Sequence, residues 1–399
     1  MADSAPPPRK VLVPIANGTE PMEAVITIDV LRRAGADVTV ASAEKTSNLR
    51  VHATWGVILV ADSLVSDSAP TAFDLVSLPG GMPGASTLRD CGVLESLVRK
   101  HVAEGRVYAA ICAAPAVALG SWGLLKGLKA TCYPSFMEKL SADATAVESR
   151  VQLDGQVVTS RGPGTAMEYA VALVERLYGK EKADEVAGPM VMRSNHGDDY
   201  TVTELNPVRW TFNDTPQILV PIANGTEEME AIMIIDTLRR AKANVVVASV
   251  EDKVEIVASR KVKIVADVLL EEAAKLSFDL IVLPGGLPGA QAFAKSEKLV
   301  DLLKKQMESN RPYGAICASP AIVLEPHGLL KGKKATAFPA LCDKLSDRSH
   351  AENRVLVDGN LITSRGPGTS MEFSLAIVEK FFSRQKALEL AKTMVFINP

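Results

Sequence analysis

Aromatic residues and surplus charge are both scarce in this chain of 399 residues. Phe, Trp and Tyr together make up 5% of it, and the formal charge at pH 7 is −3. Specific nucleic-acid binding needs a basic face with stacking rings, so we expect no nucleic-acid partner. No apolar run approaches the roughly 20 residues of a membrane helix. The opening residues, MADSAPPPRK, also lack the apolar core of a signal peptide, so we expect no membrane partner.

Cysteine is sparse as well. The chain has five cysteines, an odd number, and none of them forms a C-x-x-C pair. This pattern argues against a disulfide framework and against a zinc site. A reducing cytoplasmic compartment is the simplest interpretation, with the nucleus as a further location.

The chain does contain an internal repeat. LVPIANGTEPMEA at 12–24 matches LVPIANGTEEMEA at 219–231, an offset of 207 residues, and TSRGPGTAMEY at 159–169 matches TSRGPGTSMEF at 363–373, an offset of 204. LPGGMPGA, which begins at Leu78, also returns as LPGGLPGA from Leu283. The unit of about 180 residues is far longer than the 20–50 residues of a solenoid repeat. We therefore predict a duplicated domain.

Each copy alternates strand and helix signals. In the first copy we expect strands at 10–16, 37–42, 73–79 and 107–111, helices at 19–34, 86–104 and 164–178, and a hairpin at 150–161. Apolar strands that alternate with helices predict a mostly parallel sheet covered by helices on both faces. We place the first domain at 9–186, a polar connector at 187–215 and the second domain at 216–399.

One cysteine recurs between a predicted strand and a predicted helix. Cys112 stands in YAAICAAPAVALG and Cys317 in YGAICASPAIVLE. Helix N–H groups at that position favour an anion and can lower a thiol pKa from about 8.5 towards 3.5–7.5. The alternative is packing, because cysteine is among the most buried residue types. Repetition does not decide between them, since duplicated cores also keep their packing. The unmatched Cys91, Cys132 and Cys342 are interpreted as packing or surface residues.

Two other repeated segments follow predicted strands. NGTE-x-ME places Glu23 and Glu230 one turn inside a helix, where a carboxyl in a dry pocket has a raised pKa and can transfer protons near neutral pH. Glu20 and Glu227, three residues earlier, are explained equally well by compensation of the helix dipole.

The glycine loop is the other segment. The backbone N–H groups of paired glycines can point into one concavity and bind an oxyanion, although tight turns use glycine routinely. The loop does not have the G-x-G-x-x-G spacing, so we infer no dinucleotide.

Histidine occupies no position that the two halves share. His101 aligns with Gln306, His327 aligns with Trp122, and His196 lies in the connector. A mechanism common to both halves therefore cannot use a Cys–His pair, which argues against protease or glutaminase chemistry.

The four motifs together closely resemble the DJ-1/PfpI superfamily, and more narrowly its plant members with two such domains in one chain. NGTE-x-ME, LPGG-x-PGA, AICA-x-PA and TSRGPGT occur in this order twice, and the resemblance runs from Lys10 to the end of the chain except for the connector. It implies a flavodoxin-like fold for each domain, a three-layer α/β/α sandwich.

The resemblance also implies site residues. Cys112 and Cys317 correspond to the family's reactive cysteine on a strained turn, and Glu23 and Glu230 to its protonated partner. The glycine-loop amides correspond to Gly80, Gly81, Gly285 and Gly286. The family commonly has a histidine near the cysteine in a THP segment, where this chain has Tyr133 and Phe338.

By the same resemblance, the expected activity is glutathione-independent conversion of methylglyoxal and glyoxal to lactate and glycolate, with deglycase activity on early glycation adducts. This chemistry needs no cofactor and no metal. The alternative is a redox-sensing or chaperone protein that binds antioxidant enzymes. Family members usually dimerise, so the two domains are expected to form a pseudo-dimer within one chain, with a further homo-oligomer as an open alternative.

Overall fold

The computed structural model describes residues 7–46, 48–194, 197 and 199–398. The chain divides into two compact units, 1–189 and 190–399. The first six residues of the opening segment lie outside the described residues, and so does His196 of the predicted connector.

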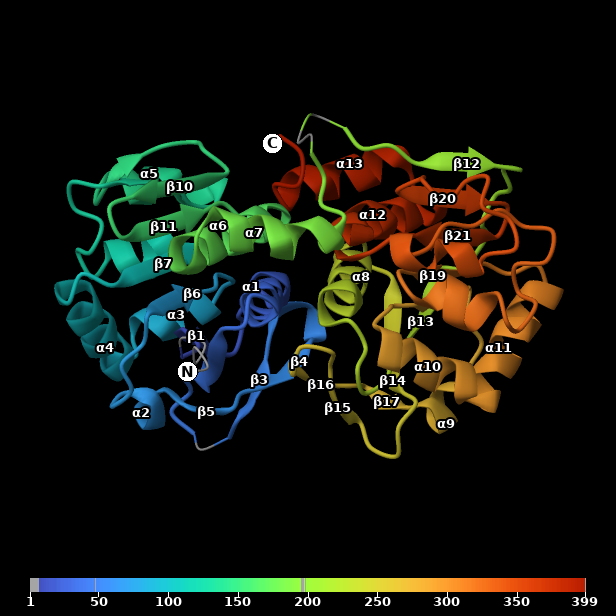
Figure 1. Cartoon of the computed structure of the whole chain (residues 1–399), viewed down its shortest axis with the longest axis horizontal. Helices are drawn as coiled ribbons and strands as arrows, with labels where there is room; N and C mark the ends of the chain where they lie inside the picture. The colour runs from blue at the N-terminus through green and yellow to red at the C-terminus, as the bar shows by residue number, and fades with distance from the viewer. Residues whose placement is uncertain (1–6, 47, 195–196, 198, 399) are drawn as a thin grey trace, which may run out of the picture. The chain divides into compact units, whose positions relative to one another are not determined.

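The first unit contains a seven-stranded sheet in the order β10-β11-β7-β6-β1-β2-β5 (Figure 1). The strands are β1 (Lys10–Ile15), β2 (Asp37–Ser42), β5 (Ser63–Leu64), β6 (Leu75–Leu78), β7 (Val107–Ile111), β10 (Val151–Asp154) and β11 (Val157–Ser160). Neighbouring strands run parallel except in the β10–β11 hairpin. The prediction of a mostly parallel sheet is confirmed.

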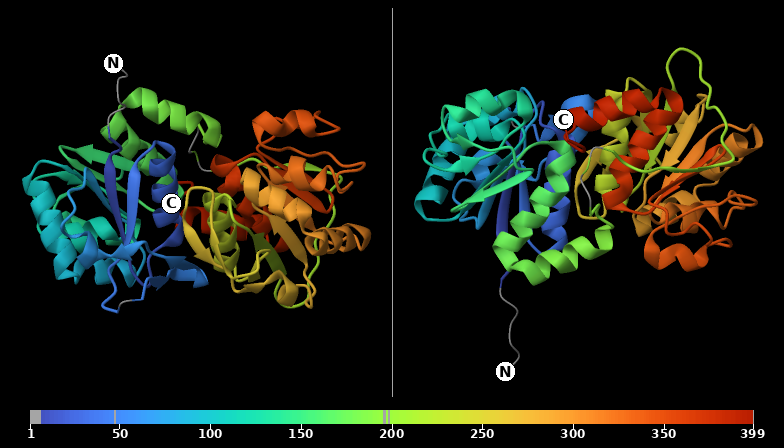
Figure 2. Two further views of the ribbon diagram at one scale, coloured as in Figure 1. Left: turned by 60° about the horizontal axis from the view of Figure 1, so that its bottom comes forward. Right: turned by 90° about the horizontal axis from the view of Figure 1, so that it is seen from above.

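Helices cover both faces of this sheet (Figure 2). The helices are α1 (Pro21–Arg33), α2 (Val65–Ser68), α3 (Gly84–Arg89), α4 (Gly92–Ala103), α5 (Met137–Ser141), α6 (Ala166–Tyr178) and α7 (Lys180–Ala187), with a π-helical turn, η2 (Pro115–Gly120). The single helix predicted for 86–104 is wrong. It is divided between α3 and α4 because Cys91 adopts an extended conformation at the start of α4.

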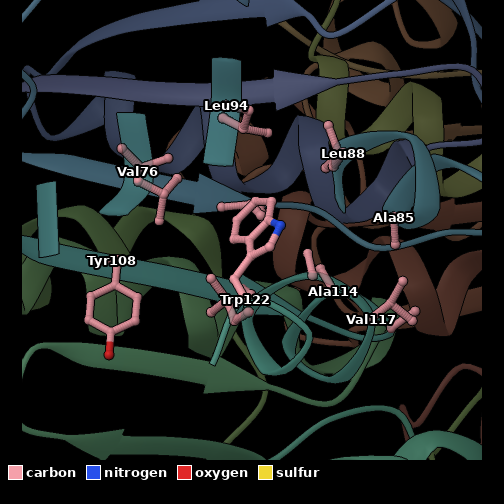
Figure 3. Packing of buried hydrophobic residues seen from close by; sticks show 14 of the residues in the cluster. Val76, Ala85, Leu88, Leu94, Tyr108, Ala114, Val117 and Trp122 are labelled. Carbon is pink, nitrogen blue, oxygen red and sulfur yellow. The ribbon is translucent and has the colours of Figure 1, made fainter. Parts of the chain in front are cut away.

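One apolar cluster fills the space between the sheet and η2. Figure 3 shows Trp122 among Tyr108 of β7, Leu88 of α3 and Val117 of η2. The indole Nε1 of Trp122 donates to the Arg89 carbonyl over 3.1 Å, which satisfies its polar group inside the core. This packing holds the π-helical turn that follows Cys112 against the sheet.

The second unit repeats the arrangement with one more strand, in the order β12-β20-β21-β19-β18-β13-β14-β17. The strands are β12 (Thr203–Leu205), β13 (Gln217–Ile222), β14 (Asn244–Ser249), β17 (Val268–Leu269), β18 (Leu280–Leu283), β19 (Tyr313–Ile316), β20 (Val355–Asp358) and β21 (Leu361–Ser364). The helices are α8 (Glu228–Arg240), α9 (Leu270–Ala273), α10 (Leu287–Lys295), α11 (Glu297–Glu308), α12 (Ser370–Phe381) and α13 (Arg384–Thr393), with the π-helical turn η6 (Pro320–Leu324).

The extra strand comes from the predicted connector. β12 pairs in parallel with β20, and Trp210 is buried with its Nε1 donating to the Gly359 carbonyl over 3.0 Å. The ring of Trp210 packs edge-on against Phe381. The connector from Met190 onward therefore belongs to the second unit.

No helix in the described part of the chain combines the length and the apolar character needed to cross a membrane. Each sheet has a topological switch point, since the chain leaves β1 towards β2 and later returns to β6 on the other side of β1. The second unit has the same reversal at β13, between β14 and β18. Open α/β sheets bind ligands at this point, beyond the carboxyl ends of the strands.

Candidate active site

The predicted site residues of each unit follow adjacent strands at the switch point. In the first unit, Glu23 follows β1, Gly80 follows β6 and Cys112 follows β7. Because these three strands run parallel, their carboxyl ends meet at one edge of the sheet. The second unit places Glu230, Gly285 and Cys317 after β13, β18 and β19 in the same way.

Both cysteines adopt a strained backbone conformation. Cys112 has a φ of 64° and Cys317 a φ of 63°, in the left-handed region that residues with a Cβ rarely occupy. Such a conformation costs on the order of 1–3 kcal/mol and persists only where the surroundings impose it. It turns the side chain away from the strand direction just before the π-helical turn that begins at Pro115 or Pro320.

Two backbone hydrogen bonds impose this turn in each unit. The Cys112 N–H donates to the Ser160 carbonyl over 3.0 Å, and the Tyr133 N–H donates to the Cys112 carbonyl over 2.8 Å. The corresponding bonds in the second unit join Cys317 to Ser364 over 3.0 Å and Phe338 to Cys317 over 2.7 Å. The positions where the family often has histidine thus hold the cysteine by their backbone, whichever side chain they carry.

Hydrogen bonds within and around the TSRGPGT segment fix the position of Ser160, whose carbonyl accepts from Cys112. Ser160 Oγ donates to the Arg150 carbonyl over 2.7 Å and lies 2.6 Å from the hydroxyl of Thr165. Arg150 in turn forms an ion pair of 2.7 Å with Glu168 of α6. The segment therefore supports the cysteine through the backbone.

Each glutamate is fully buried at the start of its helix. Glu23 and Glu230 both have 0% exposure. Glu23 Oε2 accepts from the Gly80 N–H over 2.8 Å, and Glu230 Oε2 accepts from the Gly285 N–H over 2.7 Å. Glu20 caps helix α1 by accepting from the Met22 N–H. This capping role explains a glutamate at position 20 without a catalytic role.

Glycine at position 80 is a steric requirement. A Cβ there would lie 2.6 Å from Cys112 Cβ and 2.8 Å from Glu23 Oε2. At Gly285 the corresponding distances, to Cys317 Cβ and Glu230 Oε2, would be 2.5 and 2.6 Å. The cysteine, the glutamate and the glycine therefore meet at one point in each unit.

The sulfur of each cysteine lies between the carboxyl and the next glycine. Cys112 is hydrogen-bonded to the Glu23 side chain and to the Gly81 N–H, and Cys317 to Glu230 and the Gly286 N–H. Cys112 is half-buried, and Cys317 is 8% exposed. With one sulfur and one carboxyl, the site offers fewer donors than four-coordinate zinc requires.

These surroundings change the expected acidity of the thiol. Burial raises the pKa of the Cys112 thiol well above its ordinary value, and the neighbouring Glu23 carboxylate raises it further, while the Gly81 N–H acts in the opposite direction. Burial and Glu230 raise the pKa of Cys317 in the same way. The prediction of a lowered thiol pKa is wrong, because it counted the helix N-terminus and omitted burial and the adjacent carboxylate.

A thiolate in this site therefore requires a proton on the glutamate. Two acidic groups that interact this closely titrate as a pair. The pair shares its last proton and releases it only at a raised apparent pKa. The pair has two forms of equal charge, thiol with carboxylate and thiolate with carboxylic acid. The second form contains a nucleophile beside an acid.

The two glycine amides have different partners. The N–H of Gly80, like that of Gly285, is bonded to the glutamate instead of pointing towards a substrate oxygen as expected. The Gly81 and Gly286 amides are the ones directed at the sulfur. They are the remaining candidates for an oxyanion that forms next to the sulfur.

His101 lies away from this site. His101 Nε2 is 2.6 Å from the carbonyl of Val107, the first residue of β7. Cys112 follows the last residue of the same strand, about 16 Å away at 3.3 Å per residue. His101 therefore belongs to the opposite edge of the sheet.

Sequence reasoning missed two features of the site. The carbonyl that receives the cysteine N–H is a backbone group and carries no sequence signal. The other is a buried hydroxyl pair in the first unit, Ser77 Oγ and Tyr169 OH, 2.7 Å apart. The halves differ at these positions, with Val282 and Phe373 in the second, and that mismatch could have revealed the pair.

Comparisons with known proteins show which sequences this chain resembles. Protein DJ-1 homolog B of Arabidopsis thaliana is 69% identical over 96% of this chain and 87% of its own length. Protein DJ-1 homolog A of the same plant is 63% identical over 96% of this chain and 98% of its own. Glutathione-independent glyoxalase DJR-1.2 of Caenorhabditis elegans is 33% identical over 46% of this chain and 95% of its own.

The profile of the DJ-1/PfpI family matches residues 9–176 and again residues 216–380. These two ranges contain the cysteine, the glutamate and the glycine loop of each unit. The chain belongs to the DJ-1/PfpI family and carries two of its domains in tandem.

Proposed function

We propose that this protein is a glutathione-independent glyoxalase that converts methylglyoxal to lactate and glyoxal to glycolate. The observation that carries the proposal is the buried pair of a cysteine sulfur and a glutamate carboxyl at a strained turn, present in each domain. The nematode relative that bears the name of this activity supports it.

In the first step, the thiolate form of Cys112 attacks the aldehyde carbon of methylglyoxal and forms the C–S bond. The carbonyl oxygen becomes an alkoxide, which the Gly81 N–H stabilises, and it takes the proton of Glu23. The product is a neutral hemithioacetal beside an ionised glutamate. The proton that kept Glu23 neutral has thus been used, and a base has been generated.

In the second step, Glu23 removes the hydrogen of the former aldehyde carbon. The enediolate that forms is protonated by the same carboxyl on the adjacent carbon, as a glutamate base does in isomerases. The hydroxyl proton of the first carbon passes to the second oxygen. The product is a lactoyl thioester of Cys112. Water hydrolyses it to lactate and the thiolate and releases two protons, of which one returns to Glu23 and the other goes to solvent. The thiolate beside a carboxylic acid is thus restored without an oxidant or cofactor. Cys317, Glu230 and Gly286 perform the same steps in the second domain.

The test is an assay with purified protein and methylglyoxal in the absence of glutathione, which follows both substrate loss and lactate. Cys112→Ser with Cys317→Ser is expected to abolish turnover, whereas either single change leaves the other domain active. Wild-type turnover in the double variant would remove the assignment. Deglycase activity on an early adduct of methylglyoxal with an amino acid is part of the proposal and is measured with the same variants.

A redox sensor is the second candidate, and the same hydrogen bonds to sulfur favour it. Two equivalents of peroxide would convert the thiolate to a sulfinate, whose oxygens can accept from Gly81 N–H and from a protonated Glu23. In this role the protein would respond to oxidation by binding antioxidant enzymes or misfolded clients. Absent turnover, together with a gain of two oxygens on Cys112 or Cys317 by mass spectrometry, would favour it.

We further propose that the protein acts in the cytoplasm and that its two domains replace the family's dimer within one chain. A fluorescent fusion at native expression tests the first proposal, with the nucleus as the other outcome. Analytical ultracentrifugation tests the second, for which the mass of a single chain is expected. A larger species would indicate a further homo-oligomer.

A further inference from the structure

The first domain has a polar pair next to its glutamate that the second domain replaces with apolar residues. Ser77 of β6 is 1% exposed and Tyr169 of α6 is fully buried, and their hydroxyl oxygens are 2.7 Å apart. At the corresponding positions the second domain has Val282 and Phe373, both fully buried and neither with a hydroxyl.

The hydroxyl pair lies on elements that pack against or lead directly to those holding the Glu23 carboxyl. Ser77 precedes Gly80, whose N–H binds Glu23 Oε2, by only three residues. Helix α6, which carries Tyr169, packs against α1, which carries Glu23. Burial is the main cause that raises the pKa of the Tyr169 phenol, and the charge of Glu23 adds to it, as expected for near neighbours.

We propose that the hydroxyls of Ser77 and Tyr169 stabilise the Glu23 carboxylate. Buried dipoles favour the ionised form of a carboxyl, whereas apolar neighbours favour the protonated form. The shared proton of the first site therefore resides more on the sulfur than it does in the second site. Cys112 is the more thiol-like of the two reactive cysteines, and Cys317 carries the larger thiolate fraction.

The other groups that act on the two cysteines occur in both domains. Glu20 acts on Cys112 as Glu227 acts on Cys317, from equivalent helix starts. The amides of Gly81 and Gly286 both lower the pKa of their cysteine, the Gly286 amide by a larger share of the causes, and Tyr169→Phe leaves both amides in place. The inference concerns only the location of a proton, so it holds whether the protein is a glyoxalase or a sensor.

Alkylation by iodoacetamide tests the proposal, because the thiolate is the species that reacts. Peptide mass spectrometry measures the rates at Cys112 and Cys317 in the same sample of full-length protein. The two sulfurs differ in exposure, so the informative quantity is the change that a substitution causes. Tyr169→Phe is expected to raise the Cys112 rate about three- to tenfold, corresponding to half to one pKa unit, with the Cys317 rate as the internal control.

The reciprocal variant provides the opposite prediction. Val282→Ser with Phe373→Tyr installs the hydroxyl pair in the second domain and is expected to lower the Cys317 rate by a similar factor. This variant leaves the first site untouched, so Cys112 is then the control. If Tyr169→Phe does not fold, as judged by urea unfolding, the reciprocal variant decides the question.

The pH profile separates a change in proton location from a loosened structure. A shift of the shared proton raises the Cys112 rate to a higher plateau between about pH 6 and 8, where the pair keeps one proton. A loosened site would expose an ordinary thiol, and its rate would climb near pH 8.5. An unchanged or lower Cys112 rate, or a profile of the loosened kind, would overturn the proposal.

Discussion

The two domains repeat the catalytic geometry closely but surround it with different side chains. The glutamate–glycine distances are 2.8 and 2.7 Å, and the cysteine φ values are 64° and 63°. Other buried residues differ: the first domain has a hydroxyl pair, whereas helix α8 of the second begins with a buried carboxylate, Glu228, where the first has Pro21. The comparison teaches that backbone hydrogen bonds and the glycine fix the positions of the cysteine and the glutamate. The neighbouring side chains can then vary and change where the shared proton resides.

The largest expected effect comes from Glu23→Gln and Glu230→Gln. Each is placed in a single-site background, with Cys317→Ser for the first and Cys112→Ser for the second. An amide can still donate to the sulfur but cannot move a proton between carbons, so lactate formation is expected to fall about 10²- to 10⁴-fold at either site. Peroxide oxidation of the remaining cysteine should fall far less. Retained lactate formation would contradict the proton shuttle.

Gly80→Ala and Gly285→Ala test whether the two sites are sterically equivalent. The new Cβ would lie within 2.8 Å of the cysteine Cβ and the glutamate oxygen in both, so each change should displace one of them. We expect loss of turnover in the altered domain and a destabilisation of about 1–3 kcal/mol, measured by urea unfolding. Normal activity of either variant would show that the space beside the cysteine and the glutamate can accommodate a methyl group.

Alkaline pH should weaken both domains through their thiols. Because burial raises the pKa of Cys112 and Cys317 in the folded chain, the folded state keeps a proton that the unfolded state releases above about pH 8.5. Stability is therefore unaffected below that pH and falls above it by about 1.4 kcal/mol per pH unit for each cysteine.

The check is a series of urea unfolding curves from pH 7 to 10. Cys112→Ala and Cys317→Ala should each remove the contribution of one cysteine to this loss of stability. That contribution amounts to about 2 kcal/mol of unfolding free energy at pH 10. A slope that neither substitution reduces would mean that other groups cause the loss. Equal contributions from the two cysteines would show that both pairs keep their proton throughout this pH range.

The smallest expected effect concerns the loops that follow β3 (Arg50–His52) and β15 (Glu255–Val257). Glu228 accepts from Ser259 Oγ over 2.7 Å and from the Arg260 N–H over 2.8 Å. In the first domain, Thr54 Oγ1 donates to Glu20 Oε2 over 3.1 Å. Glu228→Ala should cost about 1–2 kcal/mol, because it removes hydrogen bonds from partly buried donors. Thr54→Val is the matched control and should cost about 1 kcal/mol or less.

Much of the fold followed from the sequence because strand and helix periods were clear. The parallel sheet, the hairpin and the helix at Ala166–Tyr178 were predicted from alternation alone. The division between α3 and α4 was missed because Cys91 is not a typical N-cap residue, although Ser296 at the matching place is one. Comparing the two halves at that point would have indicated the division.

For the site, the sequence indicated which residues lie together. It did not indicate how their proximity and burial change the pKa of the cysteine. The order of strands brings Glu23, Gly80 and Cys112 together, and this order followed from the repeat and the family resemblance. The raised thiol pKa depends on how deeply the pair is buried, which a motif does not contain. The assignment of the Gly80 amide to Glu23 depends on distances of a fraction of an ångström, which are likewise absent from the sequence.

Infrared spectroscopy at neutral pH tests most directly whether a protonated glutamate stands beside each reactive sulfur. A carboxylic acid absorbs separately from a carboxylate, and the difference between wild type and Glu→Gln isolates one residue. We predict an acid band that is lost in both Glu23→Gln and Glu230→Gln, with the larger loss for Glu230. A spectrum in which neither substitution removes an acid band would contradict the account, because both sites would then hold a carboxylate and an unreactive thiol.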